Sequence, residues 1–313
     1  MPPEHRPPVA DRFAQAVASG SLDLPLPGGG RTGKRWAALQ ALGEDDPVLA
    51  RLGEGHADAL AILAELGGAA PPETRWGVWA AAPTSLTATR DGDGWSISGD
   101  RPWCSGAQVC THALVTAAAP DGIRLFAVAN TGTPLDGTWP ALGMAASDSR
   151  TVRFTDVSAA PVGEPGAYLE RPGFWHGAIG VAACWYGGAV GVARRLLDAA
   201  HGRDDPLLLA HLGAVDAALV AARSTLDSAA IAVDADPAGD ARRLALRTRA
   251  IVETAATEVL QRVGRALGAG PLCRDERHAA RVADLTVYLR QSHAERDLAA
   301  LGADVAAGGD PAW

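Results

Sequence analysis

The sequence predicts an α+β fold with a shortened helical region at residues 1–72, a middle β-barrel or β-sandwich at 73–162 and a C-terminal four-helix bundle at 163–313. Two observations carry this prediction. Between residues 73 and 162, short runs of alternating apolar and polar residues are separated by turn residues, as is typical of strands. From residue 173 onward, apolar residues recur instead at three- and four-residue spacing, as in helices that bury one face.

The first 72 residues predict three helices, at 11–18, 36–42 and 47–66. Asp46 and Pro47 form a strong start for the third, because an aspartate caps free N–H groups and proline suits the first helical position. The glycines between 28 and 33 have the spacing of a phosphate-binding loop. Arg35 stands where such a loop needs Ser or Thr, so we expect an ordinary loop there.

The middle region predicts six strands, near 76–82, 85–90, 95–99, 112–119, 123–129 and 150–157. The second and third form a β-hairpin, because the Asp-Gly-Asp-Gly run at 91–94 tolerates the positive φ of a tight turn. This hairpin leads to Trp103, Cys104 and Ser105. An indole face and a hydroxyl at that point could contact a flat heterocycle.

The last region predicts four helices. One starts near Tyr186, two are separated by a break at 234–240, and the fourth covers 279–301. The second carries an apolar stripe made by Leu212, Val215, Leu219, Ala222, Leu226, Ala229 and Val233. The apolar stripes on four helices are more extensive than one bundle interior can bury, so we expect a homodimer or homotetramer.

Composition excludes several classes of protein. The net charge of −8 and the lack of a basic run argue against a nucleic-acid partner. Apolar stretches are interrupted by charged residues, so no membrane partner is expected. The four cysteines form no Cys-x-x-Cys pair and no signal peptide is recognisable, which indicates a cytoplasmic protein.

Two segments resemble the acyl-CoA dehydrogenase family. The run Gly-Trp-Ser-Ile-Ser-Gly at 94–99, followed by Trp-Cys-Ser-Gly-Ala at 103–107, is similar to the strand that sets an aromatic residue and a Ser or Thr beside that family's flavin. The run Leu-Gly-Met-Ala-Ala-Ser-Asp-Ser at 142–149 resembles the family's Leu-Gly-Met turn. The resemblance covers roughly residues 48–302. It implies the same fold and an FAD cofactor.

The resemblance also implies cofactor contacts. Trp103, Cys104 and Ser105 would lie beside the flavin ring. Arg203 is the nearby guanidinium that could meet the pyrophosphate. The turn from Gly268 to Gly270 would approach the adenosine of a partner chain's FAD.

The family's catalytic glutamate has no counterpart at either of its two positions. An ungapped alignment places Ser292 at the usual one, with His293 beside it, and Val181 near the other. Leu285, Leu289 and His293 are spaced four apart, so on the predicted last helix they share one inward face. His293 and Ser292 are therefore the candidate catalytic residues, since an imidazole suits proton transfer near neutral pH. The alternative is that His293 belongs to a salt-bridged helix end.

Three functions stay open. The first is a flavin-dependent oxidoreductase of the EC 1.3 type that acts on an acyl thioester, bound to CoA or a carrier, with a non-standard base. The second is a flavin-dependent monooxygenase on the same fold, towards which the run at 290–297 leans. The third is a non-catalytic subunit in a hetero-oligomer with a full-length relative. The family's loop before the hairpin is reduced here to residues 80–85, which changes the expected acyl pocket.

Overall fold

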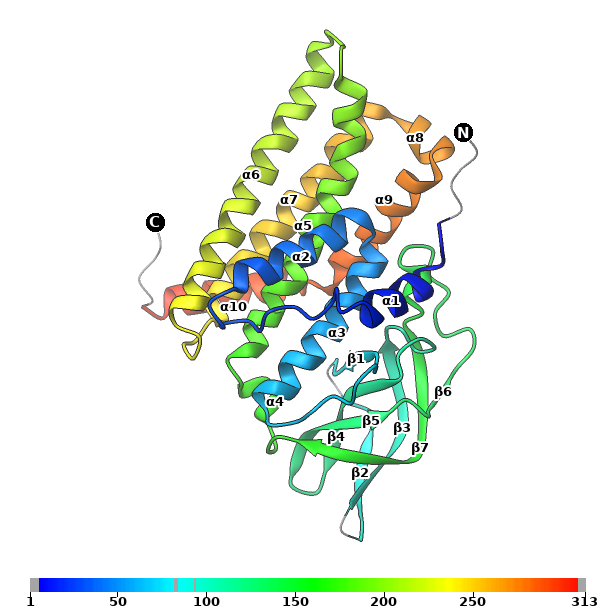
Figure 1. The fold of residues 1–313 in the computed structure, drawn as a ribbon. Coiled ribbons are helices and arrows are strands. Elements are labelled where there is room, and N and C mark those ends of the chain that lie inside the picture. Colours follow the sequence, from blue (N-terminus) through cyan, green and yellow to red (C-terminus); the bar gives the residue numbers. More distant parts are fainter. Residues whose placement is uncertain (1–5, 82–83, 93, 309–313) are drawn as a thin grey trace. The chain divides into compact units, whose positions relative to one another are not determined.

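The computed structural model describes residues 6–81, 84–92 and 94–308. Contacts divide the chain into two compact units, whose elements are drawn in Figure 1. Unit 1 contains the residues up to Leu24 together with Arg51–Ala141 and Ala145–Phe174. Unit 2 contains Pro25–Ala50, the short segment Leu142–Met144 and the chain from Trp175 onward.

Unit 1 is a β-barrel with helices α1 (Val9–Ala18), most of α3 (Pro47–Glu65) and α4 (Ala167–Glu170). Its strands pair in the order β1-β4-β2-β3-β7-β5, β6 pairs with β7, and a further β4–β5 pairing closes the sheet. The strands are β1 (Trp76–Trp79), β2 (Thr87–Asp91), β3 (Gly94–Cys104), β4 (His112–Ala119), β5 (Gly122–Ala129), β6 (Thr133–Pro134) and β7 (Arg150–Val162). Because β4 and β5 pair with each other, the sheet closes on itself and neither strand is left with an unpaired edge at that point.

The predicted hairpin is present, with Thr87 opposite Ser98 and Asp91 opposite Gly94. Strand β3 continues beyond its predicted end near residue 99 as far as Cys104, because it stays paired with β7 through two irregularities in register. Such bulges shift the alternation on which the prediction relied. At Gly99, which has a φ of +128°, an added Cβ would lie 2.6 Å from the Ser85 carbonyl oxygen, so only glycine fits.

Helix α3 packs on the barrel through an apolar cluster. The cluster comprises Ala59, Ile62, Leu63, Trp76, Leu114, Leu125 and Val162. The predicted cap at Asp46 is present, since its carboxylate accepts hydrogen bonds from the backbone N–H groups of Val48 and Leu49. His56 is 3% exposed, and its Nδ1 accepts the backbone N–H of Trp76. Burial lowers the pKa of this imidazole to about 4.

Unit 2 is a helical bundle built from α5 (Gly173–Ala200), α6 (Pro206–Ala235), α7 (Arg242–Leu267) and α9 (Glu276–Tyr288), with α2 (Thr32–Asp45) packed against it. The short helix α8 (Ala269–Arg274) precedes α9. Helices α2 and α5 cross backbone to backbone: a Cβ at Gly187 would lie 2.0 Å from the Gln40 carbonyl oxygen, and one at Gly43 would lie 2.3 Å from that of Cys184. Glycine at both positions is required by this crossing.

Helix α2 begins at Thr32, four residues before the predicted start. Its first turn is capped from α6, because the Asp234 carboxylate accepts both the backbone N–H of Thr32, at 3.0 Å, and its hydroxyl, at 2.6 Å. A cap that comes from more than 200 residues away gives no local signal. The predicted loop is present but ends at Arg31, so its extension to residue 35 was wrong.

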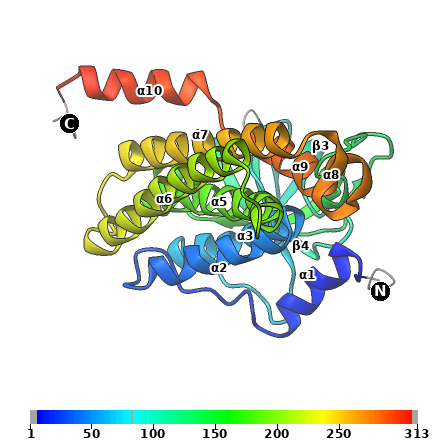
Figure 2. The same ribbon diagram turned by 90° about the horizontal axis from the view of Figure 1, so that it is seen from above.

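The predicted last helix, 279–301, is not continuous. Helix α9 ends at Tyr288, a 3-10 turn covers Leu289–Gln291, and α10 begins only at Glu295 and ends at Ala306. Arg249 holds the segment after α9, because its guanidinium donates to the Gln291 carbonyl at 3.2 Å and to that of Ala178 at 2.8 Å. Helix α10 then runs beside α7 (Figure 2).

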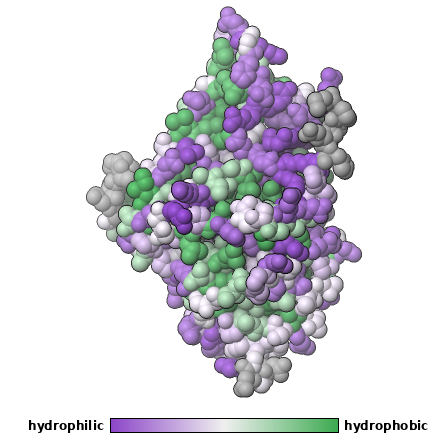
Figure 3. Space-filling model, viewed as in Figure 1, coloured by the Kyte–Doolittle hydropathy of each residue, from purple (hydrophilic) through white to green (hydrophobic). Residues whose placement is uncertain are grey.

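Helix α6 has two apolar faces. Leu208, Val215, Ala222, Leu226, Ala229 and Val233 are buried in unit 2. The opposite face exposes Leu209, Val220 and Ile231, and apolar side chains are visible along this helix in Figure 3. Among the described helices, α6 is also the one that is long and apolar enough to cross a membrane. Length and composition alone are weak evidence for such a role.

Candidate functional site

The three predicted ring contacts at the end of β3 have different environments. Trp103 is 61% exposed, Cys104 is fully buried and Ser105 is 8% exposed. The indole of Trp103 meets that of Trp139 edge to face, with ring centroids 5.9 Å apart. Trp103 therefore presents an apolar ring at the surface of unit 1, while the Cys104 side chain and most of Ser105 are buried.

Trp103 has a φ of +65°, a conformation that costs a non-glycine residue about 1–2 kcal/mol. The surrounding bonds hold this turn, since the backbone N–H of Ser105 donates to the Trp103 carbonyl and the Trp79 indole donates to the Ser105 carbonyl. Strain that the fold maintains at an exposed aromatic residue is characteristic of functional sites.

Cys104 is a core thiol. Burial raises its pKa to about 12, and its Sγ donates to the Arg101 carbonyl at 3.1 Å. The neighbouring Arg101 is also fully buried, and its guanidinium donates to the carbonyls of Trp79 and Ala81 at 2.7 and 2.6 Å. These bonds fix the end of β1 next to β3. Sequence reasoning missed Arg101, although a charged residue in an alternating strand is a usable signal.

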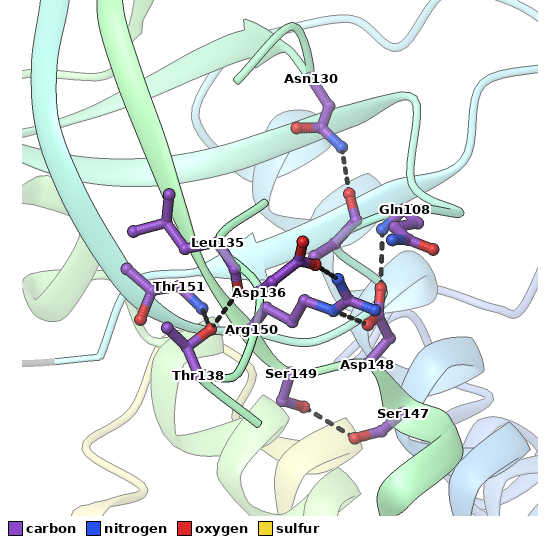
Figure 4. Close-up of polar contacts among 11 residues, drawn as sticks. Gln108, Asn130, Leu135, Asp136, Thr138, Ser147, Asp148, Ser149, Arg150 and Thr151 are labelled. Carbon is purple, nitrogen blue, oxygen red and sulfur yellow. Dashed lines mark hydrogen bonds and ion pairs between the residues drawn. The ribbon is translucent and has the colours of Figure 1, made fainter. Parts of the chain in front are cut away.

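The two segments that carried the family resemblance meet through hydroxyl groups. Ser105 Oγ lies 2.8 Å from Ser149 Oγ, which lies 2.8 Å from Ser147 Oγ. The backbone N–H of Gly106 donates to the Ser147 carbonyl at 2.7 Å and so fixes the two segments in register. Figure 4 shows Ser147 and Ser149 pointing toward each other below the neighbouring charged groups.

Asp148 holds the loop that follows Ser105. Its carboxylate accepts the backbone N–H of Gln108, at 3.1 Å, and Nε of Arg150, at 2.6 Å (Figure 4). A second carboxylate, Asp136, accepts from the same guanidinium. Asn130 adds two bonds through its Nδ2, to the carbonyls of Ala107 and Cys110. Sequence reasoning named none of these supports, although Asp148 lies inside the Leu-Gly-Met segment.

Asp284 anchors the Leu-Gly-Met turn within unit 2. Its Oδ1 accepts the backbone N–H of Met144 at 2.5 Å, and Met144 has a φ of +57°. An added Cβ at Gly143 would lie 2.2 Å from the Ala283 carbonyl oxygen, so the turn lies directly on α9. Burial raises the pKa of Asp284 to about 6, and Asp46 contributes in the same direction.

The predicted pyrophosphate and adenosine contacts lie in unit 2. Arg203 is exposed in the turn between α5 and α6. Gly268, with a φ of +63°, ends α7. The turn predicted from Gly268 to Gly270 is shorter in the structure, because Gly270 lies inside α8. Pro271 explains this, since proline is tolerated in the first turn of a helix.

Ser292 and His293 lie in the break after α9, so the prediction that His293 shares an inward face with Leu285 and Leu289 was wrong. The two leucines are buried, whereas the His293 side chain is 59% exposed. Its Nδ1 lies 3.2 Å from Oδ1 of Asp297, which matches the alternative of a salt-bridged helix end. Ser292 lines a cavity of about 40 Å³, which has room for water but not for an acyl chain. The catalytic role of both residues stays a prediction.

The matches to known proteins are structural. No family model matches the sequence, and no curated protein matches it. The complex of TdsC from Paenibacillus sp. A11-2 with FMN and indole has a TM-score of 0.79 at 19% identity, over 94% of each chain. Methanesulfinate monooxygenase MsuC from Pseudomonas fluorescens has a TM-score of 0.79 at 17% identity, over 97% of this chain and 96% of that chain.

A third structure, the Tcur3481-Tcur3483 steroid ACAD, has a TM-score of 0.72 at 21% identity, over 96% of this chain and 90% of that chain. The chain has an acyl-CoA dehydrogenase-like fold. The predicted α+β fold, with strands between two helical regions, is therefore confirmed. These structures are 17–21% identical to the chain, so the comparison establishes its fold and not its reaction.

Proposed function

We propose that this protein is a flavin-dependent oxidoreductase whose flavin ring contacts unit 1 at Trp103 and Ser105. The observation that carries the proposal is the exposed indole held at positive φ beside a nearly buried hydroxyl. A flavin fits such a surface, because its face can pack on the indole and its nitrogen edge can bond the hydroxyl. A bound flavin would supply two-electron transfer and, when reduced, reactivity toward oxygen.

FAD and FMN differ in the contacts that they need beyond the flavin ring. FAD is the cofactor that the family resemblance implies, with Arg203 toward its pyrophosphate and Gly268 and Gly270 toward its adenosine. TdsC, which has the same fold, binds FMN, a flavin that lacks the adenosine. Titration with FAD and with FMN separates the two, since only FAD affinity should fall when Gly268 is changed.

Monooxygenation is the reaction class that the site favours. Dehydrogenation of an acyl thioester needs a carboxylate to remove the α-proton. The family resemblance aligns Ser292 with that glutamate, and Ser292 lines a cavity that is too small for an acyl chain. TdsC and MsuC, which share the fold, are named as monooxygenases. In such a reaction the chain's own residues would bind and orient the flavin and keep its edge away from water.

Dehydrogenation of a CoA-bound or carrier-bound acyl thioester is the second candidate, and one observation favours it. The Asp297 carboxylate lies 3.2 Å from Nδ1 of His293 and leaves Nε2 of the imidazole available for proton transfer. If this base operates, His293→Ala should lower turnover about 100-fold and leave flavin affinity unchanged. Asp297→Asn should lower turnover less, because the imidazole is retained. Unchanged turnover in His293→Ala removes the residue from the mechanism.

The test of the main proposal is flavin binding. Purified protein should change the absorbance of added FAD or FMN, and Trp103→Ala should weaken binding about 10-fold. Ile123→Ala, which removes another exposed apolar side chain of unit 1, serves as the control and should bind as the parent does. Rapid oxidation of the reduced flavin by oxygen supports the monooxygenase, and bleaching by an acyl-CoA supports the dehydrogenase. No binding of either flavin leaves the non-catalytic subunit as the function.

The assembly that we propose is a homodimer or homotetramer. The exposed apolar face of α6 supports it, because Val220 and Ile231 are 57% and 73% exposed on a helix whose other face is already buried. A hetero-oligomer with a full-length relative would use the same face. Contact with a second chain would remove this apolar surface from water.

A further inference from the structure

Arg101 brings a positive charge into the interior of unit 1 that no carboxylate neutralises. Its side chain is fully buried. Among the described residues, the groups that act on its charge are the Cys104 thiol on β3 and the Tyr168 hydroxyl on α4. Burial raises the pKa of both groups to about 12, so both are neutral near neutral pH. Burial also lowers the pKa of Arg101, but a guanidinium stays protonated in proteins, so its charge is uncompensated.

The hydrogen bonds of Arg101 do not account for this charge. Its Nε and Nη2 donate to the carbonyls of Trp79 and Ala81, and its Nη1 is buried without a hydrogen-bond partner in the part of the chain that the structure describes. Two donations to carbonyls are within the capacity of a neutral amide side chain. A buried cation without a charged partner is strongly disfavoured, so hydrogen bonding alone does not explain why this residue is charged.

One residue, Trp79, connects this charge to the candidate flavin surface. The Trp79 carbonyl accepts from Arg101 at 2.7 Å, and the Trp79 indole donates to the Ser105 carbonyl at 2.9 Å. Trp103, with its exposed indole, lies two residues before Ser105. Trp79 is itself 1% exposed, so protein and not water fills the space between the charge and this turn. A charge acts more strongly through such a medium than through water.

We propose that the charge of Arg101 makes the candidate flavin surface hold reduced flavin as an anion, in preference to oxidised flavin. This inference rests on the proposed function. Oxidised flavin has a neutral ring, whereas uptake of two electrons and one proton leaves a negative charge on the ring at N1. Uptake of a second proton there neutralises the ring, and a nearby cation opposes that step. Arg101 thus acts on the flavin through space, from inside the barrel.

The charge predicts a loss of affinity for one redox state. A tryptophan with a hydrogen bond at each end spans about 12 Å, and a unit charge at that distance, at an effective dielectric constant of about 20, changes the Kd of an anion about 10-fold. Arg101→Gln removes the charge and keeps a donor, so at pH 8 the Kd of reduced flavin should rise about 10-fold relative to that of oxidised flavin. The midpoint potential of the bound flavin should fall accordingly. Arg101→Lys keeps the charge and should keep this ratio.

The dependence on pH separates the charge from a structural role. Reduced flavin loses its N1 proton near neutral pH, so in acid its ring is neutral in the parent and in Arg101→Gln alike. The difference between the two proteins should therefore be present at pH 8 and shrink near pH 5. Cys104 and Tyr168, with pKa values of about 12, do not titrate in this range. A loss caused by a disturbed turn at Trp103 would be the same at both pH values.

Two controls isolate the buried charge. Arg90→Gln, which removes an exposed guanidinium from β2 of the same barrel, should change neither Kd. The flavin phosphate carries the same charge in both redox states, so its effect cancels in the ratio of the two Kd values. Thermal unfolding of the flavin-free protein checks that each variant folds. If Arg101→Gln does not fold, the parent carries the test: its bound reduced flavin should keep the absorbance spectrum of the anion to a pH about one unit below that of free reduced flavin.

The measurements are the Kd of oxidised FAD and FMN by absorbance titration, the Kd of their reduced forms by anaerobic titration, and the midpoint potential by dye equilibration. A loss of preference for reduced flavin in Arg101→Gln that is absent in Arg101→Lys supports the proposal. An unchanged ratio in Arg101→Gln, or an equal change in both variants, overturns it and leaves the flavin-dependent function standing. A parent whose bound reduced flavin takes up its proton at the same pH as free flavin overturns it too. If the unaltered protein binds neither flavin, the proposed function fails and this proposal fails with it.

Discussion

Asp284→Asn should stabilise the protein at neutral pH. The carboxyl of Asp284 has its pKa raised from 3.8 to about 6 by burial, so its ionised form is disfavoured in the folded state. At about 1.4 kcal/mol per pKa unit the full shift would be worth about 3 kcal/mol, which partial exposure reduces to about 1–2 kcal/mol. Asparagine keeps the Oδ1 that accepts the Met144 N–H and removes the charge.

The direction of the Asp284 pKa shift gives the pH range in which the substitution should stabilise the protein. A carboxyl with a raised pKa stabilises the fold while it is protonated, and this contribution is lost as the pH rises through about 6. Urea unfolding should therefore show Asp284→Asn to be more stable than the parent by about 1–2 kcal/mol at pH 8 and equal to it near pH 4. Asp227→Asn, which removes an exposed carboxylate paired with Arg223, is the control for the loss of a negative charge at the surface. If the free energy of unfolding differs between Asp284→Asn and the parent by the same amount at pH 4 and pH 8, the reasoning is refuted.

Three further predictions test other parts of the fold. Burial lowers the pKa of His56 to about 4, so this neutral imidazole should cost stability as the pH falls from about 6.5 toward 4, and His56→Gln should flatten that dependence in urea unfolding. Gly187→Ala would bring a Cβ within 2.0 Å of the Gln40 carbonyl oxygen and should lower the free energy of unfolding by about 2 kcal/mol or more, whereas Gly213→Ala, which meets nothing within 4 Å, should not. Changing Val220 and Ile231 to Asp should lower the mass measured by light scattering to near 32.1 kDa, and a parent protein that already has this mass contradicts the proposed assembly.

The features that the sequence could predict are those with local causes. Asp46 caps the helix that it immediately precedes, and the 91–94 turn joins the two strands beside it. The periodic residues of α6, such as Val215 and Leu226, are buried as their spacing predicted. Each of these features depends on residues within one or two turns of chain, so the pattern and its structural cause coincide.

The features that the sequence could not predict have partners far along the chain. Asp234 caps the start of α2, and Arg249 holds the segment after α9. The break after α9 moved His293 from the expected inward face to solvent. At the candidate site, Trp103 and Ser105 were named from the family resemblance, whereas the links from Ser105 to Ser149 and Ser147 depend on the pairing of β3 with β7. No local pattern encodes that pairing.

The glycine crossing of α2 and α5 bears on how the chain folds during synthesis. Residues 40 and 43 contact residues 184 and 187. The chain from Arg51 to Phe174 lies between them in the sequence, and apart from the turn at 142–144 it belongs to unit 1. On the ribosome, α2 must therefore wait until more than a hundred further residues have emerged before its partner exists. The buried side chains of Arg35, Trp36 and Leu39 would be solvent-exposed during that interval. Unit 2 should consequently form late, and we expect the nascent chain to depend on chaperones chiefly through the exposed core side chains of this helix.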